Sequence, residues 1–151
     1  ESANTVMIGE EGQMQKGPRF MWFYPPKLVS AEAHETYLRY EFEGKIVAYK
    51  QLGGEGVTLC RKVKKIKGSL EWEIADTIED APEGMVKRQI WHQTGFKING
   101  EGFTVGFESK GKREEKEGWC SDYYGEKKPI KQTEIQTKGN RIVTNIIMPK
   151  K

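Results

Sequence analysis

Residues 96–107, FKINGEGFTVGF, carry the clearest folding signal in the chain. Two short runs that favour strands, 96–98 and 103–105, flank the polar residues Asn99-Gly100-Glu101-Gly102. An Asn-Gly pair readily takes the positive φ angles of a tight turn between antiparallel strands. The stretch therefore predicts a β-hairpin whose turn begins at Asn99.

An alternation of apolar with polar or small residues continues beyond this turn. Because successive side chains of a strand point to opposite faces, we expect Phe103, Val105 and Phe107 to share the buried face of one strand. The same period, or a run of β-branched residues, predicts further strands at 36–43, 70–74 and 141–147.

The composition agrees with a fold made of strands. Val, Ile and Thr together number 29, whereas Ala and Leu together number 11. Side chains branched at Cβ pack well on a pleated sheet and lose rotamer freedom in a helix. The sequence predicts an all-β fold, an antiparallel two-sheet β-sandwich of the jelly-roll kind.

The length of 151 residues with a 36% hydrophobic fraction indicates a single domain over residues 1–151. Within it a helix over 30–42, capped by Ser30, competes with coil over 30–35 followed by a strand, which we favour. We also expect a second hairpin that joins 133–136 to 142–144. The polar residues from Lys110 to Gly118 predict a solvated loop within an exposed segment at 108–129.

Several classes of protein lack their signals in this chain. No run of 18 apolar residues predicts a membrane span, and the composition is that of a soluble protein, secreted or cytoplasmic. Cys60 and Cys120 are not part of a CxxC pair or a Cys/His cluster, so we expect no metal site, and we expect no cofactor either. The two cysteines form either one disulfide or two free thiols. Neither His34 nor His92 lies in a nucleophile elbow, so no hydrolytic triad is predicted.

Aromatic and polar residues in the middle of the chain suggest a ligand-binding face. The C–H face of a sugar packs on an indole ring, while its hydroxyl groups need charged or amide partners. The residues that offer this combination are Trp72, Glu73, Arg88, Trp91 and His92. The leading hypothesis is a non-catalytic module that binds carbohydrate on one sheet face, with a hydrophobic core role as the alternative for the two tryptophans.

Two other functions stay open at this point. Glu71 and Glu73 flank Trp72, and a pair of carboxylates beside an aromatic ring could serve a glycan-active β-sandwich enzyme, although such a pair also arises on a solvated strand face. A closed β-barrel that carries a small apolar ligand also fits the length and the many short strands. The sequence does not indicate an oligomeric state.

Charge is segregated along the chain, although the net charge is only +3. A basic block is followed directly by an acidic segment at 71–83. The basic block consists of Arg61, Lys62, Lys64, Lys65 and Lys67. Either the two segments pair as neighbouring strands, which we favour, or the block forms a polyanion site whose affinity falls with salt.

The C-terminal third resembles the final strands of the galectins. The resemblance rests on FKINGEGFTVGF at 96–107, IKQTEIQTKG at 130–139 and NRIVTNIIM at 140–148. It implies a two-sheet lectin fold of the galectin and concanavalin kind. The galectin sugar signature is absent, because no histidine accompanies Arg61 and no arginine follows two residues beyond Trp72-Glu73. If the fold carries over, the sugar site is altered, moved or lost.

Overall fold

The computed structural model describes residues 4–19, 21–93, 96–98, 101–103, 105–121 and 123–148, without the side chains of 93, 96–98 and 101–103. Nearly all of this part is strand, and it contains one short 3-10 helix, η1 (Lys50–Leu52), and no α-helix. No described helix is both long and apolar enough to cross a bilayer.

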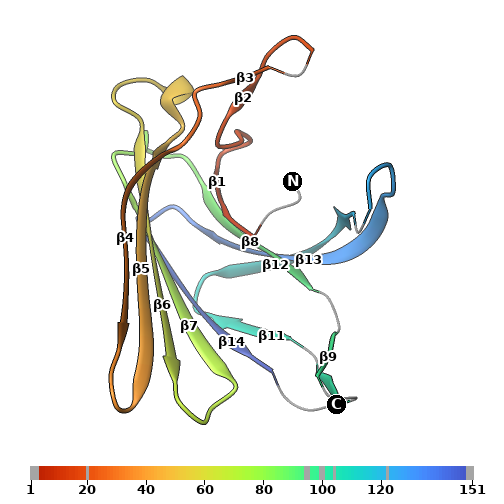
Figure 1. Ribbon diagram of the computed structural model, residues 1–151. Coiled ribbons are helices and arrows are strands. Elements are labelled where there is room, and N and C mark those ends of the chain that lie inside the picture. Colours follow the sequence, from red (N-terminus) through yellow and green to blue (C-terminus); the bar gives the residue numbers. More distant parts are fainter. Residues whose placement is uncertain are drawn as a thin grey trace.

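Two antiparallel sheets face each other (Figure 1). The large sheet has the strand order β11-β14-β7-β6-β5-β4. Its strands are β4 (Lys27–Glu35), β5 (Arg39–Ala48), β6 (Val57–Ile66), β7 (Glu71–Glu79), β11 (Gly106–Ser109) and β14 (Arg141–Ile147). The small sheet has the order β1-β8-β13-β12. Its strands are β1 (Val6–Ile8), β8 (Lys87–Gln93), β12 (Lys112–Cys120) and β13 (Lys128–Thr137).

Two short ribbons lie outside these sheets. β2 (Gln15–Lys16) pairs with β3 (Trp22–Phe23), and β9 (Phe96–Ile98) pairs with β10 (Glu101–Phe103). The second ribbon confirms the predicted hairpin, but Glu101 already pairs with Ile98, so the returning strand starts two residues earlier than expected.

The hydrophobic core lies between the sheets, since each of its two clusters contains residues from both. One cluster joins β1 to β5, β6 and β7, and consists of Val6, Ile8, Ala48, Tyr49, Val57, Leu59 and Ile78. The other joins β8 and β13 to β7, β11 and β14, and consists of Ile74, Trp91, Phe107, Ile135 and Ile142. Burying each large side chain contributes about 1.5–3 kcal/mol, so these contacts hold the sheets face to face.

A polar network crosses the same interior. Asp76 of β7, 3% exposed, accepts hydrogen bonds from Arg61 Nε at 2.7 Å and from Arg61 Nη2 at 2.8 Å. Gln89 of β8 donates through Nε2 to Asp76 Oδ2 at 2.6 Å, and its Oε1 accepts from Trp91 Nε1 at 2.8 Å and from the hydroxyl of Thr144. We call Arg61, Asp76, Gln89, Trp91 and Thr144 the interior network. It links three strands of the large sheet to β8 of the small sheet.

The predicted all-β sandwich is confirmed, and because the two sheets keep separate edges the closed-barrel alternative is wrong. The expected coil over 30–35 is also wrong, since it belongs to β4, which pairs with β5 as an edge strand. Most side chains of β4 are exposed, so its sequence shows no clear period.

The loop expected over 108–129 is wrong in its secondary structure, because β12 occupies 112–120. β12 is an edge strand that is mostly exposed on both faces, and its alternating charges form ion pairs such as Lys131–Glu115 at 2.9 Å. A strand without a buried face lacks the apolar alternation by which strands are recognised.

Two expectations about pairing and strand continuity are also wrong. Residues 133–136 and 142–144 form no hairpin, because the chain passes from β13 in the small sheet to β14 in the large one. Turn residues set where a chain reverses, not which sheet it joins next.

Phe103, Val105 and Phe107 do not share one strand, because β10 ends at Phe103 and β11 begins at Gly106. Phe107 lies in a buried core cluster, with Val105 packed at its margin, and the side chain of Phe103 lies outside the described part of the chain.

We predict that Asp76→Ala destabilises the fold by about 3–5 kcal/mol, because it leaves the Arg61 guanidinium and the Gln89 amide without their buried partner. Urea denaturation of both proteins measures this. The control is Glu73→Ala on the exposed face of the same strand, which should cost less than about 0.5 kcal/mol. Equal effects at the two positions would show that the interior network does not stabilise the fold.

Candidate ligand-binding site

The five predicted ligand-binding residues do not meet at one place. Trp72 lies on the face of β7 that also carries Ile74 and Asp76, which we call the inner face of the large sheet because it packs against the small sheet. Glu73, together with Glu71, lies on the opposite, outer face and is exposed. Strand alternation therefore separates Trp72 from the acids beside it in sequence.

Trp72 lines a cavity of about 550 Å³ at the β6–β7 turn end of the inner face. The cavity, named here the Trp72 cavity, is lined by Ala33, His34, Glu35, Tyr40, Glu41, Phe42, Val63, Lys65 and Trp72. Tyr40 and Phe42 are 47% and 43% exposed, whereas Trp72 is half-buried. The three rings come from two strands, and β6 lies between these. The large sheet thus presents aromatic surface to solvent beyond the region that the small sheet covers.

Two lysines of the basic block lie over these rings. Lys65 Nζ is 5.4 Å from the centroid of the Trp72 ring, and Lys67 Nζ is 4.8 Å from that of Tyr40. Lys67 also pairs with Glu35 at 2.5 Å, whereas in the part of the chain that the structure describes no carboxylate lies within 4.0 Å of Lys65 Nζ. Lys65 therefore adds a positive charge beside the half-buried indole of Trp72.

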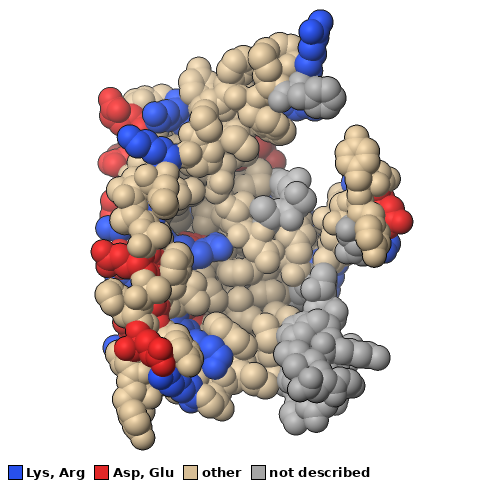
Figure 2. Space-filling view, viewed as in Figure 1, with Lys and Arg blue, Asp and Glu red and all other residues tan. Residues whose placement is uncertain are grey.

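The inner face continues from this cavity into an apolar groove of about 280 Å³. Phe42 lines both, and Leu28, Ala31 and Ile46 extend the groove along β4 and β5 toward Arg61. In the view of Figure 2, the surface is hollowed to the right of the wall that β4 to β7 form. A chain-like ligand longer than one sugar unit could lie along this surface.

The basic block does not form one strip. β6 pairs with β7, so the favoured prediction of neighbouring strands is confirmed, with Lys64 opposite Glu73 and Arg61 opposite Asp76. Lys62 and Lys64 lie on the outer face, where Lys62 Nζ is 3.4 Å from Glu43. Arg61 and Lys65 lie on the inner face, so the block is divided between the two sides of the sheet.

Trp91 and His92, which the sequence predicts as ligand contacts, do not line the Trp72 cavity. Trp91 is 6% exposed in the core, stacked on Phe107 at 5.6 Å, with the Arg61 guanidinium 5.2 Å from its ring. His92 points to the other side of β8, where its Nδ1 lies 3.1 Å from Asn4 Oδ1. The core alternative is therefore correct for Trp91.

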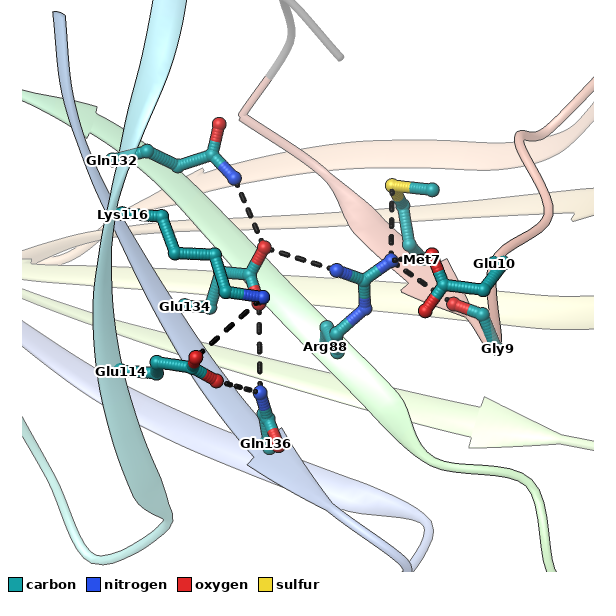
Figure 3. Close-up of polar contacts among 9 residues, drawn as sticks. All are labelled: Met7, Gly9, Glu10, Arg88, Glu114, Lys116, Gln132, Glu134 and Gln136. Carbon is teal, nitrogen blue, oxygen red and sulfur yellow. Dashed lines mark hydrogen bonds and ion pairs between the residues drawn. The ribbon is translucent and has the colours of Figure 1, made fainter.

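Arg88, the remaining predicted residue, belongs to an ion-pair cluster on the small sheet (Figure 3). Its Nη1 donates to Glu134 Oε1 at 3.0 Å, and its Nη2 donates to the carbonyl of Gly9 at 3.1 Å. Lys116 Nζ lies 3.2 Å from Glu134 Oε2, and Gln132 donates to Oε1 at 3.0 Å. With Arg88 and Glu134 both buried, this arginine acts as a structural partner rather than as a ligand contact.

The ionisation of Glu134 follows from this cluster. Burial alone would raise the pKa of its carboxyl group, but the hydrogen bond from Lys116 and the positive charges of Arg88 and Lys116 outweigh it and hold the pKa below its usual range. Glu134 is thus charged at neutral pH in a nearly closed environment.

The two cysteines are free thiols, so the disulfide alternative is wrong. Burial raises the pKa of the Cys60 thiol, as expected of a small buried side chain rather than a nucleophile. Glu71 and Glu73, the pair considered for catalysis, lie on the outer face, away from the Trp72 cavity.

The sequence missed Tyr40 and Phe42 as ligand-site candidates, although their alternation was visible. Both were expected on the buried face of a strand, and they do lie on the inner face, but at its open end. Tyr40 lies opposite Lys65, and Lys65 lies opposite Trp72. This register depends on how three strands pair, so the sequence of one strand alone does not predict it.

No family model matches the sequence, and no curated protein matches it. Solved structures do match its fold. Over 98% of the chain it is similar to a heparinase III, at a TM-score of 0.64 and 14% identity, and to the heparan sulfate lyase HepC from Pedobacter heparinus, at 0.65 and 12%. The chain spans about a quarter of the length of these proteins, 24% in each case. At this identity the likeness shows the fold alone.

We predict that Glu134→Gln destabilises the protein by about 3 kcal/mol at pH 7, because Arg88 loses its buried counter-ion. The folded pKa of Glu134 is depressed, so its contribution is present above the unfolded value of about 4.3 and is lost as pH falls through the folded pKa. Urea denaturation at a series of pH values should therefore show a flatter acid-side slope in the variant.

The control for this prediction is Glu117→Gln on exposed β12, which should leave both stability and slope unchanged. A Glu134→Gln protein with the wild-type slope would contradict the assignment of this carboxylate as a paired, charged group.

Proposed function

We propose that this chain is a non-catalytic carbohydrate-binding module, and that it holds a segment of acidic glycan in the Trp72 cavity. The observation that carries the proposal is the half-buried indole of Trp72 with Lys65 Nζ 5.4 Å from its ring, in a cavity open to solvent. An indole packs against the C–H face of a sugar, and a lysine ammonium attracts a sulfate or carboxylate on the same or the next sugar.

A carboxylate beside this aromatic surface can accept hydrogen bonds from sugar hydroxyl groups. Glu35 lies opposite Tyr40 on the inner face, and Lys67 holds its carboxylate beside the aromatic rings. Such a mixture of apolar surface and a few polar groups is typical of small-molecule sites. The size of the cavity, about 550 Å³, suits one or two sugar units.

The similar solved structures support the choice of an acidic glycan. Their names describe a heparan sulfate lyase and a heparinase, and heparan sulfate is by its name a sulfated glycan. This chain spans 24% of the length of those proteins, so each of them has about three quarters of its length outside the matching part. A binding role for the matching part, beside a separate catalytic part, is compatible with these lengths. We do not assign catalysis to Glu71 and Glu73, which face away from the cavity.

We predict that Trp72→Ala lowers affinity for a heparan sulfate oligosaccharide at least tenfold, equivalent to about 1.4 kcal/mol. Lys65→Gln should lower affinity less and flatten the slope of log affinity against log salt, because one ionic contact is lost. Calorimetric titration at several salt concentrations measures both effects.

The matched control is Trp119→Ala. Trp119 likewise lies under a lysine, with Lys127 Nζ 4.2 Å from its ring, but it is exposed and belongs to β12 of the small sheet. Its loss should leave affinity unchanged. Unchanged affinity in Trp72→Ala, or an equal loss in Trp119→Ala, would refute the proposed site, and release of unsaturated sugar product by the purified chain would refute a non-catalytic role.

A further inference from the structure

A second cavity, of about 760 Å³, lies between two turns at the β11 edge of the large sheet. We name it the Lys110 cavity. It is lined by Glu108, Ser109, Lys110, Gly111, Thr137, Arg141, Ile142, Val143 and Asn145. Arg141, Val143 and Asn145 alternate along one face of β14, and Asn145 pairs with Glu73 of β7, whose side chain lies on the outer face. The Lys110 cavity and the Trp72 cavity are therefore on opposite faces of one sheet.

Local hydrogen bonds from side chains hold both turns around this cavity. Ser109 Oγ donates to the carbonyl of Val143 at 2.7 Å and accepts from the Gly111 amide at 3.3 Å. Thr137 Oγ1 accepts from the Gly139 amide at 3.0 Å. A Cβ at Gly111 would lie 2.7 Å from Ile135 Cγ2, so this turn packs closely on the small sheet. The walls are thus held in place without a ligand, which reduces the entropy lost on binding.

Several cations of the described chain form ion pairs, whereas the two cations of this cavity do not. Arg39, Arg61 and Lys62 each have a carboxylate within 4.0 Å, as do Arg88 and Lys131. Among the described residues, no carboxylate lies within that distance of Lys110 or Arg141. Glu108 is the only acidic residue of the lining, which therefore carries a net positive charge.

We infer that the Lys110 cavity is a second saccharide site, for a sugar unit that carries one anionic group. Lys110 and Arg141 would bind the sulfate or carboxylate, Asn145 and Glu108 would bind hydroxyl groups, and Val143 would contact a C–H face. Glu108 disfavours a bare, doubly charged oxyanion, whereas it accepts hydrogen bonds from sugar hydroxyls. The choice of an acidic sugar over other organic anions rests on the proposed function, while the cavity and its charge do not.

Two sites on opposite faces predict that one module contacts two separate stretches of a polysaccharide, or two chains. A short oligosaccharide cannot pass around the sheet, so it should occupy the sites independently. A long polysaccharide should bind more tightly than either site alone, since the second contact is then made at high effective concentration.

The test uses a heparan sulfate tetrasaccharide as probe and the Trp72→Ala protein as background, in which the first site is disabled. Saturable binding should remain, with shifts of the Gly111 backbone amide and the Asn145 side-chain amide in ¹⁵N–¹H spectra. The double change Lys110→Gln with Arg141→Gln should then weaken this residual binding at least tenfold. The matched control, Lys16→Gln with Arg19→Gln, removes the same two charges elsewhere and should leave it intact.

The outcomes separate this inference from the proposed function. Loss of all binding in Trp72→Ala alone, or residual binding that the Lys110–Arg141 change does not weaken, would overturn the second site and leave the first. If Trp72→Ala leaves the affinity for the tetrasaccharide unchanged but Lys110→Gln with Arg141→Gln lowers it, the second site is supported and the first is refuted. Shifts at Gly111 produced by inorganic sulfate but not by the tetrasaccharide would overturn a saccharide site.

Discussion

The bidentate contact between Arg61 and Asp76, extended by Gln89, is the constraint on which the arrangement of the sheets depends. Asp76 is almost fully buried, and a buried carboxylate is tolerated only when it is paired and hydrogen-bonded. Its partners lie on β6 and on β8, so the charge is satisfied only when the two sheets meet in one register. Trp91 and Thr144 complete the hydrogen bonds of Gln89 and fix its orientation.

The small sheet has fewer strands than the large one and leaves one end of the large sheet's inner face open. The small sheet covers the inner face around Asp76, Ile74 and Ile142, with Trp72 packed at the margin of that core, while the aromatic pattern of the strands continues past it to Tyr40 and Phe42. Apolar residues that would be core in a longer sandwich are left at the surface here, beside Lys65 and Lys67. An exposed apolar patch rimmed by charges is typical of a binding surface.

Strand content, the hairpin at 96–103 and the pairing of the basic and acidic segments could be predicted from the sequence, because each depends on local periodicity or adjacent residues. The site could be predicted only in part. Trp72 lines the cavity for which we propose a ligand, but Glu73 points to the opposite face, and Trp91 lies in the core, because sheet packing decides which side of a strand is covered. β12 was missed because a polar edge strand lacks the apolar alternation of a half-buried one. The galectin-like strand order stays a prediction.

The most direct test of the binding face uses the indole N–H signals of the four tryptophans, Trp22, Trp72, Trp91 and Trp119. Trp91 donates to Gln89 inside the core and serves as an internal reference. Titration with a heparan sulfate tetrasaccharide, followed in ¹⁵N–¹H spectra, should move the Trp72 signal saturably and leave those of Trp91 and Trp119 in place. A Trp72 signal that does not move while that of Trp119 or Trp22 does would contradict the assignment of the inner face as the glycan-binding surface.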